Sequence, residues 1–344
     1  MIAPSGLRIA SAATANSPVS VLRTHGGGGS PFGAILNKIV LLAAVLVCAM
    51  TMAARAQPAP SRPAPDAQIE VGGGTIDIVF SDGAPGLDRA LIQDWIRTSA
   101  QAVTTYFGRF PVSHVRLVVI AGDGRNVGGT TFGFHGGSLI RLNVGRGADA
   151  AALKRDWVLV HEMTHLALPQ LPRSGLWLQE GNATYVEPIA RAEAGQMDPA
   201  EVWKWTIDEM PSGQPKLGDG GLDSTHDHQR VYWGGAAFWL VADVRIRERT
   251  HNRIGVQTAL QAINRKSGGN TADWTMDQVM AAGDAATGGT ELVDLYAQMG
   301  KAGTPVDIDA LLKQLGVGLQ GNKVVFDDTA PLAAIRRQIT APPA

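Results

Sequence analysis

The pentapeptide His161-Glu162-Met163-Thr164-His165 limits what this chain can fold into more than any other segment. Residues four apart lie one above the other on a helix, so both imidazoles can reach one ion. Glu162 lies about 100° around the helix from His161, beside that ion, where its carboxylate can take a proton from water. The flanking residues are apolar and predict a buried helix, in which two histidines without partners would be costly. The segment therefore predicts a metal site, and the alternative is a helix whose histidines are ordinary hydrogen-bonded residues.

A candidate for the third ligand follows after a short turn. Pro169 and Pro172 end the first helix, residues 173–175 turn the chain, and a second helix is expected from Leu176. This return can bring Glu180 beside the two histidines. Two imidazoles and one carboxylate leave an open fourth position, as a catalytic zinc requires. The alternative for Glu180 is a carboxylate that faces solvent, which its apolar neighbours Trp177, Leu178 and Tyr185 disfavour.

The first 56 residues have the character of an export signal. They contain no Asp or Glu, and an apolar run over residues 39–54 ends at Ala54-Arg55-Ala56. We predict a signal peptide with a long leader, cleaved before Gln57, and hence an exported protein that is periplasmic or secreted. The alternative is an uncleaved anchor, and membrane contact is expected only in that case. The run is short for a span of about 20 residues.

Composition narrows the ligands and the partners. Cys48 is the one cysteine in the chain and lies in the leader, so a metal must be held by His, Asp or Glu. The net charge of −1 gives no reason to expect a nucleic-acid partner. Residues 57–66 are rich in Pro and Ala and predict an extended linker. Nothing in the sequence indicates an oligomeric state.

The first part of the mature chain favours a sheet. Residues 69–80 predict a strand and turn, residues 87–107 a helix, and residues 115–121 a buried strand. Residues 122–137 predict a flexible glycine-rich loop, and residues 138–144 another strand, a candidate edge of the sheet.

From residue 149 onward the pattern is mostly helical. Helices are expected at residues 149–168, 176–194, 199–209, 231–248, 254–265, 274–282, 290–299, 307–314 and 331–339, with a short strand at 324–326. The order predicts an α+β fold in one domain over residues 67–340. A small mixed sheet lobe (residues 67–148) is followed by a mostly helical lobe (residues 149–340).

The site segments resemble those of gluzincin zinc metallopeptidases, above all the aminopeptidase N and glycyl aminopeptidase relatives. The resemblance rests on HEMTH, on WLQEG at residues 177–181, and on Val231-Tyr232-Trp233-Gly234-Gly235-Ala236, over roughly residues 135–250. It implies a zincin-like fold with the active-site helix between the two lobes. It also implies Zn²⁺ ligands His161, His165 and Glu180, the base Glu162, and Tyr232 as the residue that hydrogen-bonds the oxyanion.

The chain departs from this family in one functional respect. Aminopeptidases of this kind carry a G-x-M-E-N segment upstream, whose glutamate grips the free amino terminus of the substrate. Here the corresponding strand, residues 137–144, contains no carboxylate, and only fourteen residues separate His165 from Glu180. An endopeptidase, or a peptidase that recognises another feature of its substrate, is therefore expected at least as much as an amino-terminal exopeptidase.

The expected function is zinc-dependent hydrolysis of peptide or protein substrates by a metal-activated water, with substrate pairing to the strand at residues 138–144. The alternatives are a zinc hydrolase of non-peptide substrates and a non-catalytic, peptidase-like binding or assembly module. The sequence leaves the roles of three further features open. Glu187 orients a ligand imidazole or is an ordinary helix carboxylate. His135 is expected to be a loop residue near the cleft. Residues 219–228 form a solvated loop, an active-site rim or an auxiliary oxyanion donor, or, least favoured, a second metal site.

Overall fold

The computed structural model describes residues 63–342. The signal peptide, Cys48 and most of the Pro/Ala-rich linker lie outside the described residues. Within residues 63–342, no helix is both long enough and apolar enough to cross a membrane.

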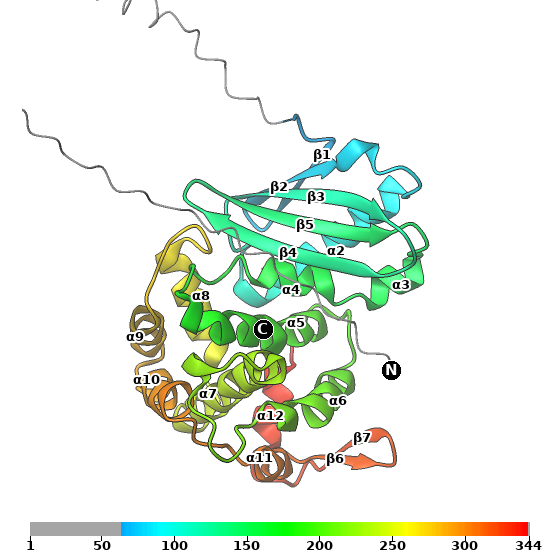
Figure 1. Cartoon of the computed structure of the whole chain (residues 1–344). Helices are drawn as coiled ribbons and strands as arrows, with labels where there is room; N and C mark the ends of the chain where they lie inside the picture. Colours follow the sequence, from blue (N-terminus) through cyan, green and yellow to red (C-terminus); the bar gives the residue numbers. More distant parts are fainter. Residues whose placement is uncertain (1–62, 343–344) are drawn as a thin grey trace, which may run out of the picture. The chain divides into compact units, whose positions relative to one another are not determined.

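A mixed five-stranded sheet forms the first layer (Figure 1). Its order is β1-β2-β3-β5-β4, in which β2, β3 and β5 run parallel and the two outer strands run antiparallel to their neighbours. Gly72 and Gly73 join β1 to β2 with φ of 54° and 81°, the left-handed backbone that a two-residue hairpin turn requires. The strands are β1 (Ala67–Val71), β2 (Gly74–Phe80), β3 (His114–Gly122), β4 (Val127–Phe134) and β5 (Gly137–Gly145).

Helix α2 (Arg89–Phe107) packs beneath this sheet (Figure 1). Asp88 begins the helix by accepting hydrogen bonds from the backbone of Ala90 and Leu91, and Gly108 ends it with φ of 70°. Its apolar face, which includes Trp95 and Ile96, is buried in the core. The predicted helix and the predicted strands on either side of it are confirmed.

The glycine-rich segment corrects the sequence prediction. Residues 127–134, expected in a loop, form β4, which is the edge strand of the sheet. The strand at residues 138–144, the expected edge, lies inside the sheet as part of β5. The glycines of β4 permit close approach to other parts of the chain: a Cβ at Gly133 would lie 1.9 Å from the backbone oxygen of Asn270.

The helical layer follows, and the α+β class with a sheet lobe before a mostly helical lobe is confirmed. The domain boundaries at residues 67 and 340 stay predictions. The helices of the helical layer are α3 (Ala150–Arg155), α4 (Val158–Thr164), α5 (Leu176–Glu193), α6 (Pro199–Glu209), α7 (Gly235–Arg249), α8 (Val256–Ser267), α9 (Met276–Thr287), α10 (Glu291–Leu295), α11 (Ile308–Gln314) and α12 (Ala333–Ile339). A small hairpin of β6 (Val317–Gln320) and β7 (Lys323–Phe326) gives the predicted late strand its partner.

Three predicted helices are interrupted. The one expected over residues 149–168 is divided between α3 and α4, because Asp156 is extended (ψ 137°) and its carboxylate accepts from the backbone N–H of Leu159. The helices expected over residues 231–248 and 290–299 each contain a π-turn, at Arg230–Gly234 and Tyr296–Lys301. A π-turn changes the backbone hydrogen-bond spacing without changing which residues are apolar, so periodicity does not reveal it.

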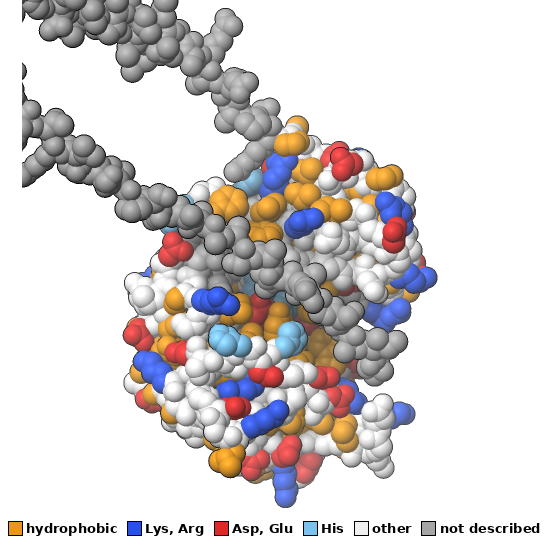
Figure 2. Space-filling model, in the orientation of Figure 1, with side chains coloured by type: hydrophobic (Ala, Val, Ile, Leu, Met, Phe, Trp, Pro, Cys, Tyr) orange, Lys and Arg blue, Asp and Glu red, His pale blue; other side chains and the backbone are white. Residues whose placement is uncertain are grey.

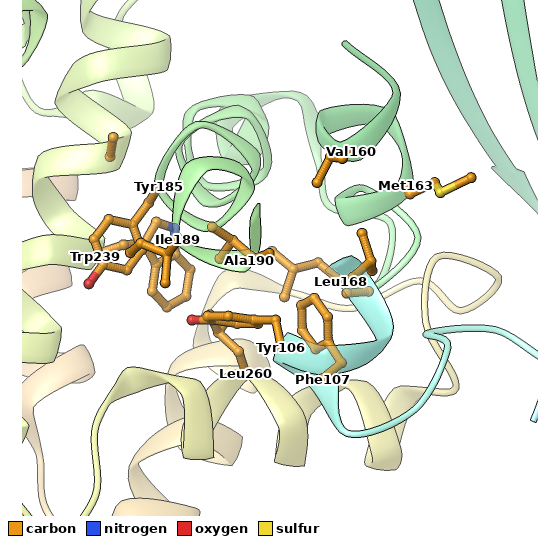
Figure 3. Close-up of a cluster of buried hydrophobic side chains, with 14 of the residues drawn as sticks. Tyr106, Phe107, Val160, Met163, Leu168, Tyr185, Ile189, Ala190, Trp239 and Leu260 are labelled. Atoms are coloured by element: carbon orange, nitrogen blue, oxygen red, sulfur yellow. The ribbon is translucent and has the colours of Figure 1, made fainter. Parts of the chain in front are cut away.

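Helix α5 runs through the centre of the core (Figure 3). Tyr185, Ile189 and Ala190 of α5 lie among buried side chains from four other helices, including Trp239 of α7. Near its start α5 crosses α7 at very short range, since a Cβ at Gly181 would lie 2.3 Å from the backbone of Gly235. This crossing holds the N-terminal turn of α7 against the helix that carries Glu180.

Glu193, at the end of α5, gives the fold a pH dependence. Burial raises its pKa to about 8, against the lowering effect of hydrogen bonds from Gln257. The folded state then holds a proton that the unfolded chain loses, so stability should fall as pH rises from about 4.5 to 8.

We expect Glu193→Gln to remove this decline. The free energy of unfolding of the variant, relative to that of the wild type, should rise by roughly 2–4 kcal/mol between pH 5 and pH 8, since one pKa unit corresponds to about 1.4 kcal/mol. Urea denaturation at both pH values measures the difference, with the exposed Glu248→Gln as control. An advantage that does not change with pH would contradict the assignment.

Candidate metal and catalytic site

Helices α4 and α5 bring three potential ligands to one point. The donor atoms of His161, His165 and Glu180 all lie within 4.8 Å of one another. The two Nε2 atoms are 3.2 Å apart, and a carboxylate oxygen of Glu180 is 3.3 Å from each. His165 caps α4 with φ −59° and ψ −19°, so the helical spacing of the pair continues past the last α4 residue. Within residues 63–342 this is the one cluster of three such side chains.

Helix α5 is held where Glu180 can reach the histidines. The chain turns through a 3-10 helix at Arg173–Gly175 and then begins α5. Trp177 donates from its indole to Asp223 (2.8 Å), and Trp239 of α7 donates to the backbone oxygen of Leu178 (3.2 Å). The ligand carboxylate therefore projects from a helix that is fixed on both sides.

The charges in the cluster stabilise one another. Burial lowers the pKa of His165, but the Glu180 carboxylate outweighs this effect and raises the pKa to about 8. Burial raises the pKa of Glu180, but the two histidines outweigh it and hold that pKa well below its usual range. Two imidazole nitrogens and one carboxylate oxygen match the donor set that zinc takes in catalytic sites, where one position stays open. The residues present therefore fit a zinc ion.

Glu162 lies beside this cluster and outside it. Its side chain is 8% exposed, and one carboxylate oxygen accepts from the hydroxyl of Thr131 on β4 at 2.7 Å. The same hydroxyl is 2.8 Å from the backbone oxygen of Glu162, so both acceptors are within its reach. Thr131 of the edge strand thus holds the carboxylate next to the three candidate ligands.

Tyr232 completes the group from the π-turn before α7. Its ring is stacked over that of His161, with centroids 6.1 Å apart and planes 12° apart. Burial, followed by the charge of Glu180, raises the pKa of Tyr232 above its ordinary value. The phenol therefore stays protonated and able to donate a hydrogen bond.

The structure assigns other partners to Glu187 and His135. Glu187 is buried and pairs with Arg191 (2.9 Å), so the suggestion that it orients a ligand imidazole is wrong. His135 lies in the turn between β4 and β5 and pairs with Asp273 (3.0 Å) in the loop before α9.

The loop at residues 219–228 is anchored by its acids. Asp223 accepts from Trp177 and, at 2.7 Å, from the hydroxyl of Tyr296. Asp227 accepts from the backbone N–H of Arg230 (3.0 Å), and Asp219 lies 3.4 Å from the guanidinium of the same residue. No metal cluster includes this loop among the described residues. His228 of this loop stacks on Tyr232, so the loop lies beside the candidate site.

Gly129 and Thr131 are site residues that sequence reasoning missed. Both lie on β4, where the glycines hid the strand. The signal that could have revealed it is the sequence Thr130-Thr131-Phe132, rich in strand-forming residues, with Phe134 at alternate spacing. On the face shown in Figure 2, histidine side chains lie beside a recessed group of hydrophobic side chains.

We expect Gly129→Ala to impair catalysis without loss of the metal. A Cβ at this position would lie 2.5 Å from Cγ of Glu162, so that side chain must move. Displacing a reacting group by about 1 Å costs on the order of 10²-fold, so turnover should fall by about 10- to 100-fold. Gly128→Ala is the matched control, because a Cβ there meets nothing within 4 Å. Equal activity of the two variants would contradict this placement of Glu162.

Comparison with known proteins relates the fold to one group. No protein-family model and no curated protein sequence matches the chain. Among solved structures, an aminopeptidase N family protein from Idiomarina loihiensis aligns with a TM-score of 0.52 and 14% identity, over 74% of this chain and 49% of that one. An M1 zinc metallopeptidase from Deinococcus radiodurans aligns with a TM-score of 0.46 and 15% identity, over 71% and 52%.

These values support a statement about the fold alone. The first alignment relates the mixed sheet and the helical lobe to the fold of the aminopeptidase N family protein. The chain spans about half the length of the solved structures that it matches.

Proposed function

We propose that this chain is an exported zinc-dependent peptidase that hydrolyses peptide bonds. The convergence of His161, His165 and Glu180 on one point carries the proposal, with Glu162 directly beside it. The fold, related to that of an aminopeptidase N family protein, agrees with it. When bound, zinc supplies the Lewis acidity that makes water a nucleophile at neutral pH and polarises the scissile carbonyl.

The chain's own residues supply the proton transfers. Glu162 takes the proton of the attacking water and passes it to the leaving amine. The hydroxyl of Thr131 orients this carboxylate at 2.7 Å. Tyr232, whose raised pKa keeps its phenol protonated, donates to the oxygen on which negative charge develops.

The edge strand β4 is the element that would bind substrate backbone. An extended peptide can add to an exposed sheet edge through main-chain hydrogen bonds. The role expected for residues 138–144 passes to β4, because β5 is hydrogen-bonded on both sides. Thr131 of β4 touches the proposed base, so a peptide paired there lies along the catalytic group.

The same strands favour an endopeptidase over an aminopeptidase. Neither β4 (VGGTTFGF) nor β5 (GSLIRLNVG) contains a carboxylate that could hold the free amino terminus of a substrate. Two rivals remain: hydrolysis of non-peptide bonds by the same water chemistry, and a peptidase-like module that binds without turnover.

A peptide-library digest read by mass spectrometry tests the function. The zinc-loaded protein should cleave library peptides and casein at internal bonds, and Glu162→Gln should not. Cleavage of esters alone would favour the non-peptide hydrolase, and no turnover of either substrate would favour the binding module.

Export is proposed on the sequence of residues 1–56. The mature protein should begin at Gln57 in the periplasm or the medium. Amino-terminal sequencing of fractionated protein decides it, and a full-length chain recovered from the cytoplasm would refute it.

A further inference from the structure

His228 covers the outer face of the Tyr232 ring. The two centroids are 4.4 Å apart and the planes differ by 16°. The ring of His161 is also nearly parallel to that of Tyr232, with the centroids 6.1 Å apart. Aromatic pairs prefer centroid separations of about 4.5–7 Å. The pair with His228 lies at the short end of that range, so its contact with the Tyr232 ring is the tighter of the two.

The backbone around Tyr232 makes such a contact necessary. Tyr232 lies in a π-turn, half-buried against the core together with Trp233, and Gly234 and Gly235 after them add no side chains. The π-turn has a hydrogen-bond spacing that is rare and marks functional sites. The rings stacked beside this turn therefore help to direct the phenol.

The loop that carries His228 is rigidly attached. Asp223 bonds it to Trp177 on the Glu180 helix and to Tyr296, at 2.8 and 2.7 Å. The guanidinium of Arg230 donates back to the oxygen of Gly220 (2.9 Å), which closes the loop on itself. The side chain of His228 is exposed, so it is not part of the core on which helix α7 packs.

We propose that His228 is a positioning residue that holds the Tyr232 phenol toward the reacting oxygen. It acts through the flat face of its ring, not through its nitrogen atoms. The inference rests on the proposed role of Tyr232 in peptide hydrolysis. It gives His228 a role in orienting Tyr232 that His226, in the same loop, does not share.

Steady-state kinetics on the best peptide of the library test the effect on turnover. Loss of one oxyanion donor costs on the order of 10²–10³ in kcat, and loss of its orientation should cost about tenfold. His228→Ala should therefore lower kcat about tenfold and leave KM and zinc content unchanged. His228→Phe keeps a flat ring and should restore kcat. His226→Ala, an exposed histidine of the same loop, is the matched control and should behave as wild type.

A spectroscopic readout tests the inference without any turnover. The chain has four tyrosines, so zinc-loaded protein labelled with 3-fluorotyrosine should give four ¹⁹F signals, with that of Tyr232 assigned by Tyr232→Phe. His228→Ala should shift or broaden this signal, and His228→Phe and His226→Ala should change it far less.

Three results would overturn the inference: full kcat in His228→Ala, equal loss of kcat in His228→Ala and His228→Phe, or an unchanged Tyr232 signal in His228→Ala. If no peptide is cleaved by the wild type, the proposed function fails, and the ¹⁹F signal alone still decides whether His228 positions Tyr232.

Discussion

Replacing Glu162 with glutamine should leave zinc bound and lower turnover by roughly 10²–10⁴, the contribution expected of a general base. Glutamine has the same size and can still accept a hydrogen bond from Thr131, which lies 2.7 Å from the carboxylate in the wild type. The proposed metal ligands are His161, His165 and Glu180, so the change does not touch them. What disappears is the group that takes a proton from water.

The measurement compares kcat and zinc content of Glu162→Gln with those of the wild type. Glu201→Gln, which changes an acid in the first turn of α6, controls for loss of one negative charge. Undiminished turnover in Glu162→Gln would refute the mechanism even in a protein that holds zinc, and the non-catalytic alternative would then gain support.

Much of the site could be predicted because its decisive spacings are local. His161 and His165 are neighbours on one helix face whatever the rest of the chain does. Two prolines and a short turn determine that α5 returns alongside α4, and this return places Glu180 3.3 Å from both imidazoles. The spacing of apolar residues along the chain needs no knowledge of tertiary contacts. It therefore predicted the order of the sheet and the helices.

The errors arose where distant contacts decide the structure. Glycine disfavours strands on average, so β4 was expected to be a loop. The glycines are present because Glu162 and Asn270 approach the backbone at Gly129 and Gly133, and neither approach is visible in the local sequence. The partner of Glu187 illustrates the same limit, since one helix turn separates it from Arg191 and two from Glu180, and only packing decides between them.

The π-turn at Tyr232 is a further feature that the local sequence did not reveal. Resemblance indicated the residue and its role, but the neighbouring His228 contact depends on a backbone spacing that side-chain periodicity does not record. For the loop before Tyr232, the favoured expectation was a solvated loop, and a rim of the site was the alternative. Its anchoring depends on Trp177 and Tyr296, which are 46 and 73 residues from Asp223.

The metal itself should be lost when one imidazole is removed. We expect the wild type to bind about one zinc per chain, because one cluster of three ligands is present in residues 63–342. His165→Ala should bring the bound zinc close to zero after dialysis. Mutation of a residue that only hydrogen-bonds a metal ligand costs about 10–100-fold in metal affinity. Removal of the ligand itself should cost more. His114→Ala, which removes an exposed histidine paired with Asp77, is the control and should keep its zinc.

Glu180→Ala separates the ligand carboxylate from the catalytic one. It keeps both imidazoles, whose Nε2 atoms are 3.2 Å apart, so weak binding should persist and excess zinc should restore part of the activity. Excess zinc should restore nothing in Glu162→Gln, because there the metal is already in place. Metal analysis and zinc titration of activity on the two variants give the comparison. If Glu180→Ala held zinc as tightly as the wild type and Glu162→Gln lost it, the two carboxylates would have exchanged roles. The assignment of base and ligand would then be wrong, although the cluster itself would stand.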